Sequence, residues 1–152
     1  MKRASRARVY NRLVHPDEVV PGSPQLERLV AACNRLGGAP LVLWDPKRGG
    51  YGLFAERDYA VGEKVTEYGG IPYPASTNRT GDYVALMGKD TLVDGRYGFR
   101  LGQEQGRWIN ESDAQRSIVN VELGRVVRVI RPVAEGEQFF GDYGPDYDRS
   151  HY

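Results

Sequence analysis

The stretch EGEQFFGDYG, from Glu135 to Gly144, poses the question that decides the fold. An apolar Phe139-Phe140 pair is followed by Gly141, an acid, a tyrosine and a second glycine. Glycine weakens a strand interior and usually marks a bulge or the close approach of another group, so a strand that only packs does not favour Gly141. We therefore expect something to lie against Tyr143.

The composition predicts one globular domain with one core, since 152 residues suffice to bury most of the unfolded surface. A net charge of +1 gives no field that would attract nucleic acid to the whole protein. Direct nucleic-acid binding is therefore not expected. A basic cluster near the start is better explained as a solvated terminus than as a nucleic-acid or import signal: Lys2, Arg3, Arg6, Arg8 and Arg12.

The single cysteine, Cys33, excludes an intramolecular disulfide, and with only His15 and His151 beside it the chain has no Cys/His zinc cluster. We therefore expect an intracellular protein without a metal. No apolar run approaches the length of a membrane span, and the first residues lack the apolar block of a secretory signal, so no membrane association is expected.

The chain divides into a basic segment with an amphipathic helix, residues 1–40, and a β-rich part, residues 41–152. Ser23-Pro24, the apolar spacing that follows and Gly37-Gly38 predict a helix over about 23–37, with Cys33 buried on its apolar face. GFRLGQEQGRWIN is compatible with a helical turn or a loop, and PYPASTNRTGD is predicted as a surface loop. The β-rich runs are LVLW, YGLFA, KVTEY, DYVAL, TLV, SIVNVEL and RVVRVI.

Four segments carry residues typical of a functional site. They are KRGGYGLFA (47–55), VGEKVTEYGG (61–70), GRWINESDAQ (106–115) and the opening stretch. Each has an ordinary explanation by itself: the first is compatible with a tight hairpin turn, and the third with an exposed turn after a buried anchor. Their order and spacing together are much more specific.

The four segments resemble the SET domain of protein lysine methyltransferases over about residues 41–147. Gly50-Tyr51-Gly52 matches the G-x-G of that family, and Gly62-Glu63 with Glu67-Tyr68-x-Gly70 matches its GE…EYxG element. Arg107-Trp108-Ile109-Asn110-x-Ser112 is similar to RFINHS, and Gly136-Glu137 with Asp142-Tyr143-Gly144 is similar to GEEL…DYG.

The resemblance implies a mostly β fold with few helices (α+β), built of small curved sheets. In this fold the C-terminal segment threads under the loop that carries the asparagine motif and forms a pseudoknot, which brings Asn110 and Tyr143 together. The chain is most similar to compact, stand-alone members without cysteine clusters before or after the SET domain. In the absence of such a cluster, Tyr147 or Tyr152 is expected to complete the wall of the lysine channel.

The cofactor implied by the resemblance is S-adenosyl-L-methionine. Backbone around the G-x-G motif would hold its methionine part, the Asn110 side chain would bind polar groups there, and backbone at Glu111 would meet the adenine. The expected cofactor-binding residues are Gly50, Tyr51, Gly52, Arg107, Asn110 and Glu111.

The resemblance also implies the catalytic residues. Tyr143 would orient the attacking amine, and Tyr68 would line a narrow lysine channel, whose expected wall comprises Tyr68, Phe140, Gly141, Tyr143 and Tyr147. Burial lowers the pKa of a lysine, and the sulfonium charge acts in the same direction, so no dedicated base is required. Asp142 and Glu67 are expected to be structural.

Three departures from the family pattern bear on function. Glu111 stands where the family has histidine, the following cysteine and Pro-Asn are missing, and Asn120 is the candidate for the later asparagine. A catalytically silent SET-fold module that binds a peptide therefore remains an alternative. Gly141 stands where the family often has Phe or Tyr, which removes bulk from the channel and predicts methylation beyond the first methyl group.

The substrate is predicted to be a basic, lysine-containing protein. Acidic residues near the channel end in sequence favour a basic peptide such as a histone tail, although a solvated acidic rim explains them equally well: Glu135, Glu137, Asp142, Asp146 and Asp148. A histone substrate places the protein in the nucleus, on chromatin, rather than in the cytoplasm. A non-histone substrate and a homodimer are compatible with the same sequence.

Overall fold

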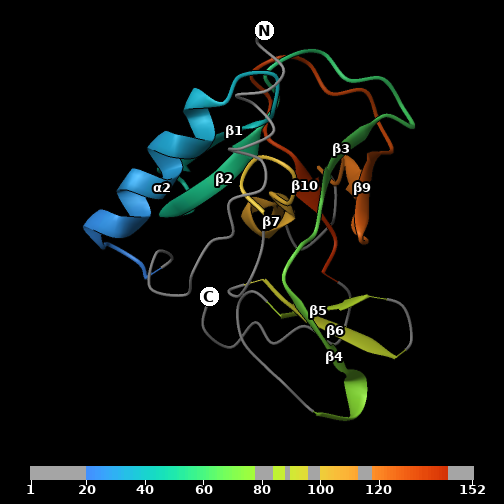
Figure 1. Cartoon of the computed structure of the whole chain (residues 1–152). Helices are drawn as coiled ribbons and strands as arrows, with labels where there is room; N and C mark the ends of the chain where they lie inside the picture. Colours follow the sequence, from blue (N-terminus) through green and yellow to red (C-terminus); the bar gives the residue numbers. More distant parts are fainter. Residues whose placement is uncertain (1–19, 78–83, 88–89, 96–99, 113–117, 144–152) are drawn as a thin grey trace, which may run out of the picture.

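The computed structural model describes residues 20–77, 84–87, 90–95, 100–112 and 118–143. Within these ranges the chain forms short strands in small sheets beside one α-helix (Figure 1). The predicted mostly β architecture is thus confirmed. In chain order the elements are α2 (Pro24–Arg35), β1 (Leu41–Asp45), β2 (Gly50–Phe54), β3 (Lys64–Glu67), β4 (Ile71–Pro74), η2 (Ala75–Thr77), β5 (Val84–Met87), β6 (Thr91–Asp94), η3 (Gly106–Trp108), β7 (Asn110–Glu111), β8 (Val121–Glu122), β9 (Val126–Val129) and β10 (Phe140–Gly141).

The predicted helix is confirmed as α2, shorter than expected at both ends. Ser23 caps it, because its hydroxyl oxygen accepts a hydrogen bond from Leu26 N–H at 3.1 Å, and Pro24 occupies the first turn. Asn34 fixes the helix to β1 by donating to Val42 O and accepting from Val42 N–H, both at 2.8 Å. The helix is therefore fixed in position against the β-rich part.

One cluster of buried side chains forms the core, as the length of the chain predicts. It joins the apolar face of α2, through Leu29 and Cys33, to Val42 of β1, Leu53 of β2 and Phe139 just before β10. Cys33 is buried, which confirms that it packs as a small hydrophobic residue. The helix thus shares the core of the β-rich part, whereas the division of the chain at residues 40 and 41 stays a prediction.

Strands β1 and β2 form an antiparallel hairpin in which Asp45 pairs with Gly50. The GG of KRGGYG lies at the end of its turn, where Gly49 N–H donates to Asp45 O at 2.9 Å. A second antiparallel sheet has the order β3-β9-β8. SIVNVEL is predicted as a short β-rich run, and in its described part, residues 118–123, only the two residues of β8 form a strand.

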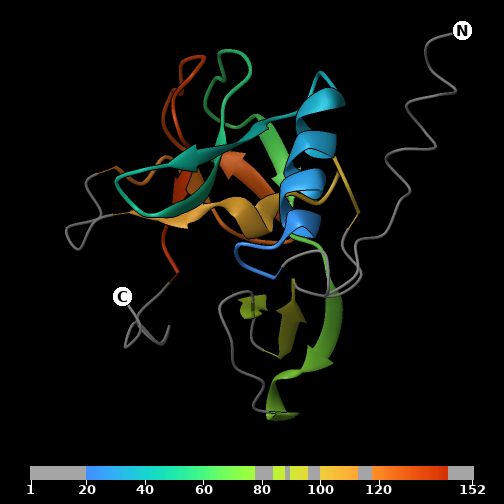
Figure 2. The ribbon, with the colours of Figure 1, turned by 90° about the vertical axis from the view of Figure 1, so that its left-hand side faces the viewer.

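A third sheet, with the order β4-β6-β5, projects from the rest of the molecule (Figures 1 and 2). We call it the lobe and take it as residues 71–94. The predicted surface loop PYPASTNRTGD is wrong in its first part, because residues 72–74 belong to β4 and residues 75–77 form η2. Pro72 and Pro74 are compatible with a strand there because β4 is an edge strand. The end of that predicted loop lies outside the described residues.

The C-terminal segment is threaded through the chain as the resemblance implies. Strand β10 runs parallel to β7 and pairs Phe140 with Asn110 (Figure 1). On its other side, Asn120 N–H donates to Phe140 O at 3.0 Å, and Phe140 N–H donates to Asn120 Oδ1 at 2.8 Å. The β10 segment is thus held between residues 110 and 120 of a single connection, an arrangement that chains generally avoid.

The undecided segment GFRLGQEQGRWIN contains one short helical turn where it is described. Its part after residue 100 consists of turns and the 3-10 helix η3, which leads directly into β7. No helix among the described residues is long and apolar enough to cross a membrane.

Candidate functional site

A cavity of about 850 Å³ opens between the start of α2, the β1–β2 hairpin and the η3–β7 segment. Its volume lies in the range of small-molecule sites. The lining residues come from four separate parts of the chain: Pro21, Gly22, Ser23, Leu26, Glu27, Trp44, Arg48, Gly49, Gly50, Tyr51, Arg107, Trp108, Asn110, Glu111, Ser112 and Tyr143. Five of the six residues predicted to bind a cofactor are in this set, together with the predicted catalytic tyrosine.

Tyr143 is anchored at both its side chain and its backbone. Its hydroxyl donates to Ile109 O at 2.5 Å, and its N–H donates to Glu111 Oε2 at 3.2 Å. The hydroxyl of Tyr143 is thus held on Ile109 O at the edge of the cavity that Tyr143 lines. Glu111, which replaces the family histidine, therefore helps to hold Tyr143 at the cavity.

Arg48 ties the hairpin turn to β7 and β10. Its Nη1 donates to Glu111 O at 2.8 Å, its guanidinium lies 4.6 Å from the centre of the Phe140 ring, and its Nε lies 3.5 Å from Asp45 Oδ2. The hydrogen bond from Gln138, with smaller contributions from Lys47 N–H and Arg48, holds the pKa of Asp45 below its ordinary value against the opposing effect of burial. Asp45 is therefore ionised at neutral pH.

Aromatic rings form one wall of the cavity. Tyr51 makes edge-to-face contacts with Trp44, at 5.4 Å between ring centres, and with Trp108, at 6.3 Å. Trp44 is 55% exposed although it touches Tyr51, so its ring is available to a ligand. The guanidinium of Arg107 lies 4.7 Å from the centre of the Trp108 ring.

The G-x-G glycines have different surroundings. A Cβ at Gly50 would meet no atom within 4 Å, which fits a cavity wall that a ligand can approach closely. A Cβ at Gly52 would lie 2.2 Å from Gln138 Oε1, so Gly52 makes room for that side chain and does not line the cavity.

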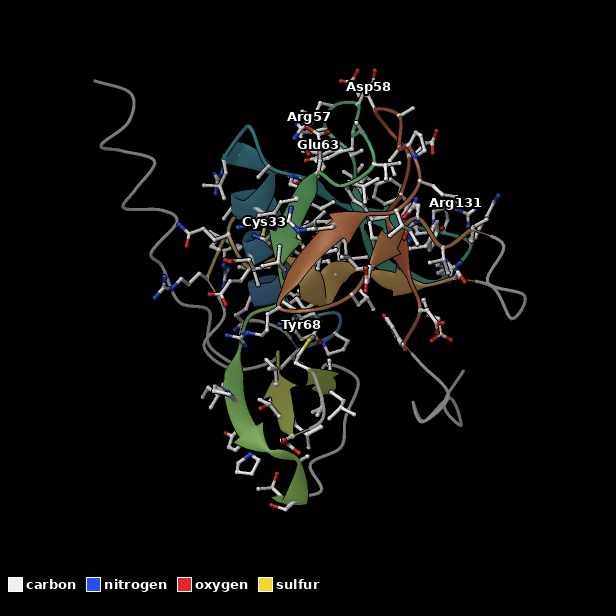
Figure 3. All side chains as sticks on the ribbon, turned by 90° about the vertical axis from the view of Figure 1, so that its right-hand side faces the viewer. Cys33, Arg57, Asp58, Glu63, Tyr68 and Arg131 are labelled. Atoms are coloured by element: carbon white, nitrogen blue, oxygen red, sulfur yellow. The ribbon has the colours of Figure 1, made fainter. Side chains whose placement is uncertain are left out.

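Tyr68, the second predicted catalytic residue, lies outside the cavity lining. It is 8% exposed at the end of β3, where the chain leaves for the lobe, and Figure 3 shows it at this junction. Its ring packs on Gly106, where a Cβ would lie 2.9 Å from Tyr68 Cδ2. Tyr68 and Tyr143 thus contact the same η3–β7 segment, at Gly106 and at Ile109 respectively.

The remaining channel residues are placed as follows. Phe140 is half-buried beneath Arg48 and is not part of the cavity lining. The space that Gly141 leaves is filled, because a Cβ there would lie 2.6 Å from Leu123 Cδ1. The sequence predicts only that Gly141 removes bulk, and the structure places the aliphatic side chain of Leu123, just after β8, in that space. Tyr147 and Tyr152 lie outside the described residues.

Several residues of the site were missed by sequence reasoning. The start of α2 was predicted only as a helix cap, yet residues 21–27 form part of the cavity wall. Trp44 was interpreted only as a strand residue, and its pairing with Tyr51 in the hairpin was the signal that could have indicated its place. Asp45 and Gln138 gave no signal, because their hydrogen bond joins positions that are 93 residues apart. No metal-binding cluster of His, Cys, Asp or Glu occurs among the described residues.

Many solved structures are similar to this fold, and two of them illustrate the similarity. The first, the crystal structure of KRYPTONITE in complex with mCHG DNA and SAH, has a TM-score of 0.55 and 19% identity over 74% of this chain and 25% of that one. The second, the structure of ctPRC2 in complex with H3K27me3 and H3K27M, has a TM-score of 0.53 and 22% identity over 72% of this chain and 15% of that one. No protein-family model and no curated protein sequence matches the chain.

These similarities agree with the resemblance carried by the sequence motifs. At such identities they establish the fold, and this chain spans only a quarter or less of each of the two solved chains. The small sheets, the parallel β7–β10 pair and the threaded C-terminal segment together show that the chain has the fold of the SET domain.

Proposed function

We propose that this protein is an S-adenosyl-L-methionine-dependent protein-lysine N-methyltransferase. The observation that carries the proposal is the meeting of Tyr143 with Gly50, Tyr51, Arg107 and Asn110 around one cavity. These residues belong to separate motifs of the sequence, and the threaded segment is what joins them. A fold that only needed to pack would not require this convergence.

The cavity suits S-adenosyl-L-methionine in size and polarity. The open backbone at Gly50, the Asn110 amide and the aromatic wall offer a close approach, a polar contact and an apolar surface. When bound, the cofactor supplies an electrophilic methyl group on a sulfonium. The KRYPTONITE structure contains SAH, the demethylated form of this cofactor, which supports the same class of ligand here.

Tyr143 is the proposed catalytic residue. Its hydroxyl is held at the cavity by the bond to Ile109 O, and its oxygen would accept a hydrogen bond from the lysine amine and orient it for in-line attack. Fixed positioning of this kind supplies up to roughly 7–11 kcal/mol of a barrier in the best cases. Tyr68 would line the lysine channel on the other side of the η3–β7 segment, where an aromatic ring suits a lysine stem and its cation.

The proposed substrate is a basic, lysine-containing protein, with a histone tail as first choice. The ctPRC2 structure contains H3K27me3 and H3K27M, which supports a histone-type peptide as the partner of this fold. Of the five acidic residues predicted near the channel end, Glu135 and Glu137 are exposed at the turn before β10, and Asp142 directly precedes Tyr143. Asp146 and Asp148 lie outside the described residues. A histone substrate implies a nuclear, chromatin-bound protein, and a homodimer is compatible with this role.

Methylation beyond the first methyl group is a further part of the proposal. The side chain of Leu123, which fills the space beside Gly141, has no hydroxyl to hold a water molecule or the amine. A tyrosine at position 141 would present one. We expect the proposed channel to run past Leu123 and, because no hydroxyl holds the amine there, to tolerate rotation of a methylated amine. Mass spectrometry of a lysine peptide after long incubation should detect dimethyl-lysine or trimethyl-lysine, and a product that stops at one methyl group would contradict this part alone.

The main test measures transfer of labelled methyl from S-adenosyl-L-methionine to recombinant core histones. We expect label on a histone with the wild-type protein and a loss of at least about a hundredfold with Tyr143→Phe, since positioning of the amine depends on the hydroxyl. Cofactor binding by Tyr143→Phe should be retained. Tyr59→Phe, which removes a tyrosine hydroxyl outside the cavity lining, is the matched control and should remain active.

The other outcomes separate the rival explanations. Cofactor binding without label on histones, but with label on other cellular proteins, would replace the histone by a non-histone substrate. Cofactor binding without any transfer would identify a catalytically silent SET-fold module that binds a peptide. Absence of cofactor binding would overturn the proposed function.

A further inference from the structure

Two amide side chains, Asn110 in the cavity wall and Gln138 behind it, belong to a chain of directed hydrogen bonds. Asn110 Nδ2 donates to Tyr51 O at 3.2 Å and to Gln138 Oε1 at 2.9 Å. Gln138 Nε2 donates in turn to Asp45 Oδ2 at 2.9 Å. Asn110 lines the cavity, whereas Gln138 and Asp45 lie behind it.

The direction of this chain is fixed at both ends. The Tyr51 carbonyl and the ionised Asp45 carboxylate can only accept hydrogen bonds. If the Gln138 amide were reversed, its oxygen would face the carboxylate and its NH₂ would face the NH₂ of Asn110. Both contacts would then be repulsive, so only the observed direction satisfies every group.

The chain also explains Gly52. A Cβ at that position would lie 2.2 Å from Gln138 Oε1 and 3.0 Å from Asn110 Nδ2, so a side chain there would separate the two amides. The second glycine of the G-x-G motif is therefore required by the hydrogen-bond chain and not by contact with a ligand.

The consequence falls on the other side of Asn110. Both hydrogens of its NH₂ group are used, one by Tyr51 and one by Gln138, while its Oδ1 accepts no hydrogen bond from the described residues. The atom that Asn110 can offer to a ligand is thus an acceptor. A ligand group that meets it must be a donor, and a cationic donor binds a carbonyl oxygen more strongly than a neutral one.

We propose that Asp45 and Gln138 are positioning residues that turn the Asn110 amide so that its oxygen faces the ligand. This makes the cavity selective for a cationic donor such as the α-ammonium of an amino-acid group. The inference rests on the proposed function, because the methionine part of S-adenosyl-L-methionine carries an ammonium of this kind. Neither Asp45 nor Gln138 needs to touch the ligand.

The test compares two probes by isothermal titration calorimetry. S-adenosylhomocysteine carries the α-ammonium, whereas 5′-methylthioadenosine has the same nucleoside without the amino-acid group. Asp45→Asn keeps the size of the side chain but leaves one acceptor oxygen for two donors, Lys47 N–H at Oδ1 and Gln138 Nε2 at Oδ2. When that oxygen accepts from Lys47 N–H, the new NH₂ group faces the NH₂ of Gln138, so that the chain is reversed or broken. We expect S-adenosylhomocysteine to bind about ten- to a hundredfold more weakly, with 5′-methylthioadenosine unchanged within about twofold.

A compensating variant distinguishes this role from general damage to the fold. Gln138→Glu alone sets two carboxylates against each other and should also weaken S-adenosylhomocysteine, with recovery at acidic pH when the two carboxylates share a proton. The double variant Asp45→Asn/Gln138→Glu restores a donor opposite an acceptor at every link. It should bind S-adenosylhomocysteine to within about threefold of the wild type, as a balanced network requires.

Each other outcome counts against the proposal. Unchanged S-adenosylhomocysteine binding in Asp45→Asn, an equal loss for both probes, or a double variant no better than the single ones would overturn it. If Asp45→Asn does not fold by circular dichroism, Gln138→Glu and its pH recovery provide the same test. If the wild type binds 5′-methylthioadenosine but not S-adenosylhomocysteine, the Asn110 inference fails, whereas binding of neither probe overturns the proposed function itself.

Discussion

The two parts of the molecule that flank the η3–β7 segment differ sharply in packing. On one side, the cavity is built on a continuous core that contains Leu29, Val42, Leu53 and Phe139, each at most 1% exposed. On the other side, β4 and β5 of the lobe contain no buried residue, and in the lobe only Val93 and Asp94 of β6 are buried among the described residues. The cavity side is thus stabilised by its own buried core. The lobe has few buried side chains, so its position depends on the junction that attaches it to the rest of the molecule.

This difference suits two different tasks. A cofactor of fixed shape requires a preformed cavity. The threaded β10 strand leads into Tyr143, which is fixed by hydrogen bonds to Ile109 and Glu111. A protein substrate varies in shape, and regions with few buried apolar contacts open at lower free energy than the core does. We infer that the lobe adapts to the partner while the cavity side remains fixed.

The largest effect that separates the two parts should come from Phe139→Ala. Phe139 is 0% exposed and makes an edge-to-face contact with Tyr59 at 5.3 Å between ring centres. We expect the free energy of unfolding to fall by about 3–5 kcal/mol in urea denaturation, since a large core side chain is lost. Leu86→Ala in the lobe, 56% exposed, is the control and should cost less than about 0.5 kcal/mol. Equal losses would contradict the comparison.

The next effect concerns the attachment of the lobe. Gly70 has a φ of +139°, and a Cβ there would lie 2.2 Å from the backbone oxygen of Asp94 at the end of β6. Gly70→Ala should therefore destabilise the protein by about 2–3 kcal/mol, because backbone must move and the φ is strained. Gly50→Ala, which meets no atom within 4 Å, is the matched control and should leave thermal stability nearly unchanged. Hydrogen exchange should locate the Gly70→Ala loss in the lobe, and uniform loss would refute its role as an attachment.

Sequence patterns predict the parts of this structure that depend on local chemistry. The cap at Ser23, the apolar face of α2 and most strands follow from spacing and turn residues, and the motifs indicate Tyr143 and Asn110. The family resemblance was needed for the threaded strand, because general rules disfavour it. No local pattern indicates that Leu123 fills the space at Gly141 or that Asp45 reaches Gln138, since side chains far apart in sequence decide both contacts.

A smaller effect should come from Trp44 at the mouth of the cavity. Its exposed ring contributes little to folding but offers an aromatic face next to Tyr51. Trp44→Ala should leave the free energy of unfolding within about 0.5 kcal/mol of the wild type and weaken S-adenosylhomocysteine by about 1 kcal/mol, or roughly fivefold. Trp44→Phe keeps an aromatic ring and should lose less. Unchanged affinity in Trp44→Ala would exclude the ring from the ligand site.

The smallest effect tests the junction by comparing two glutamates whose pKa values are shifted in opposite directions. Glu104 packs over Gly69, where a Cβ would lie 1.8 Å from Glu104 Oε2, and burial raises the pKa of Glu104 above its ordinary value of 4.5. Glu63 lies at an exposed turn, and its hydrogen bond from Ala60 N–H, together with one from Arg57, lowers its pKa. The surroundings of Glu104 at the junction thus disfavour a negative charge, whereas those of Glu63 at the turn favour one.

The sign of each effect follows from linkage between protonation and folding. A raised pKa in the folded state means that ionised Glu104 opposes folding, so Glu104→Gln should raise the free energy of unfolding at about pH 7, by about 0.5 kcal/mol. This gain should fade as the pH falls through the raised pKa and vanish below 4.5, where the glutamate is protonated in both states. Glu63→Gln should instead lower stability at neutral pH, and its loss should fade only below 4.5, as the pH falls through the lowered pKa. Thermal unfolding of both variants should therefore give changes in stability of opposite sign at neutral pH, relative to the wild type. Changes of the same sign would mean that the junction does not bury Glu104 as its packing over Gly69 indicates.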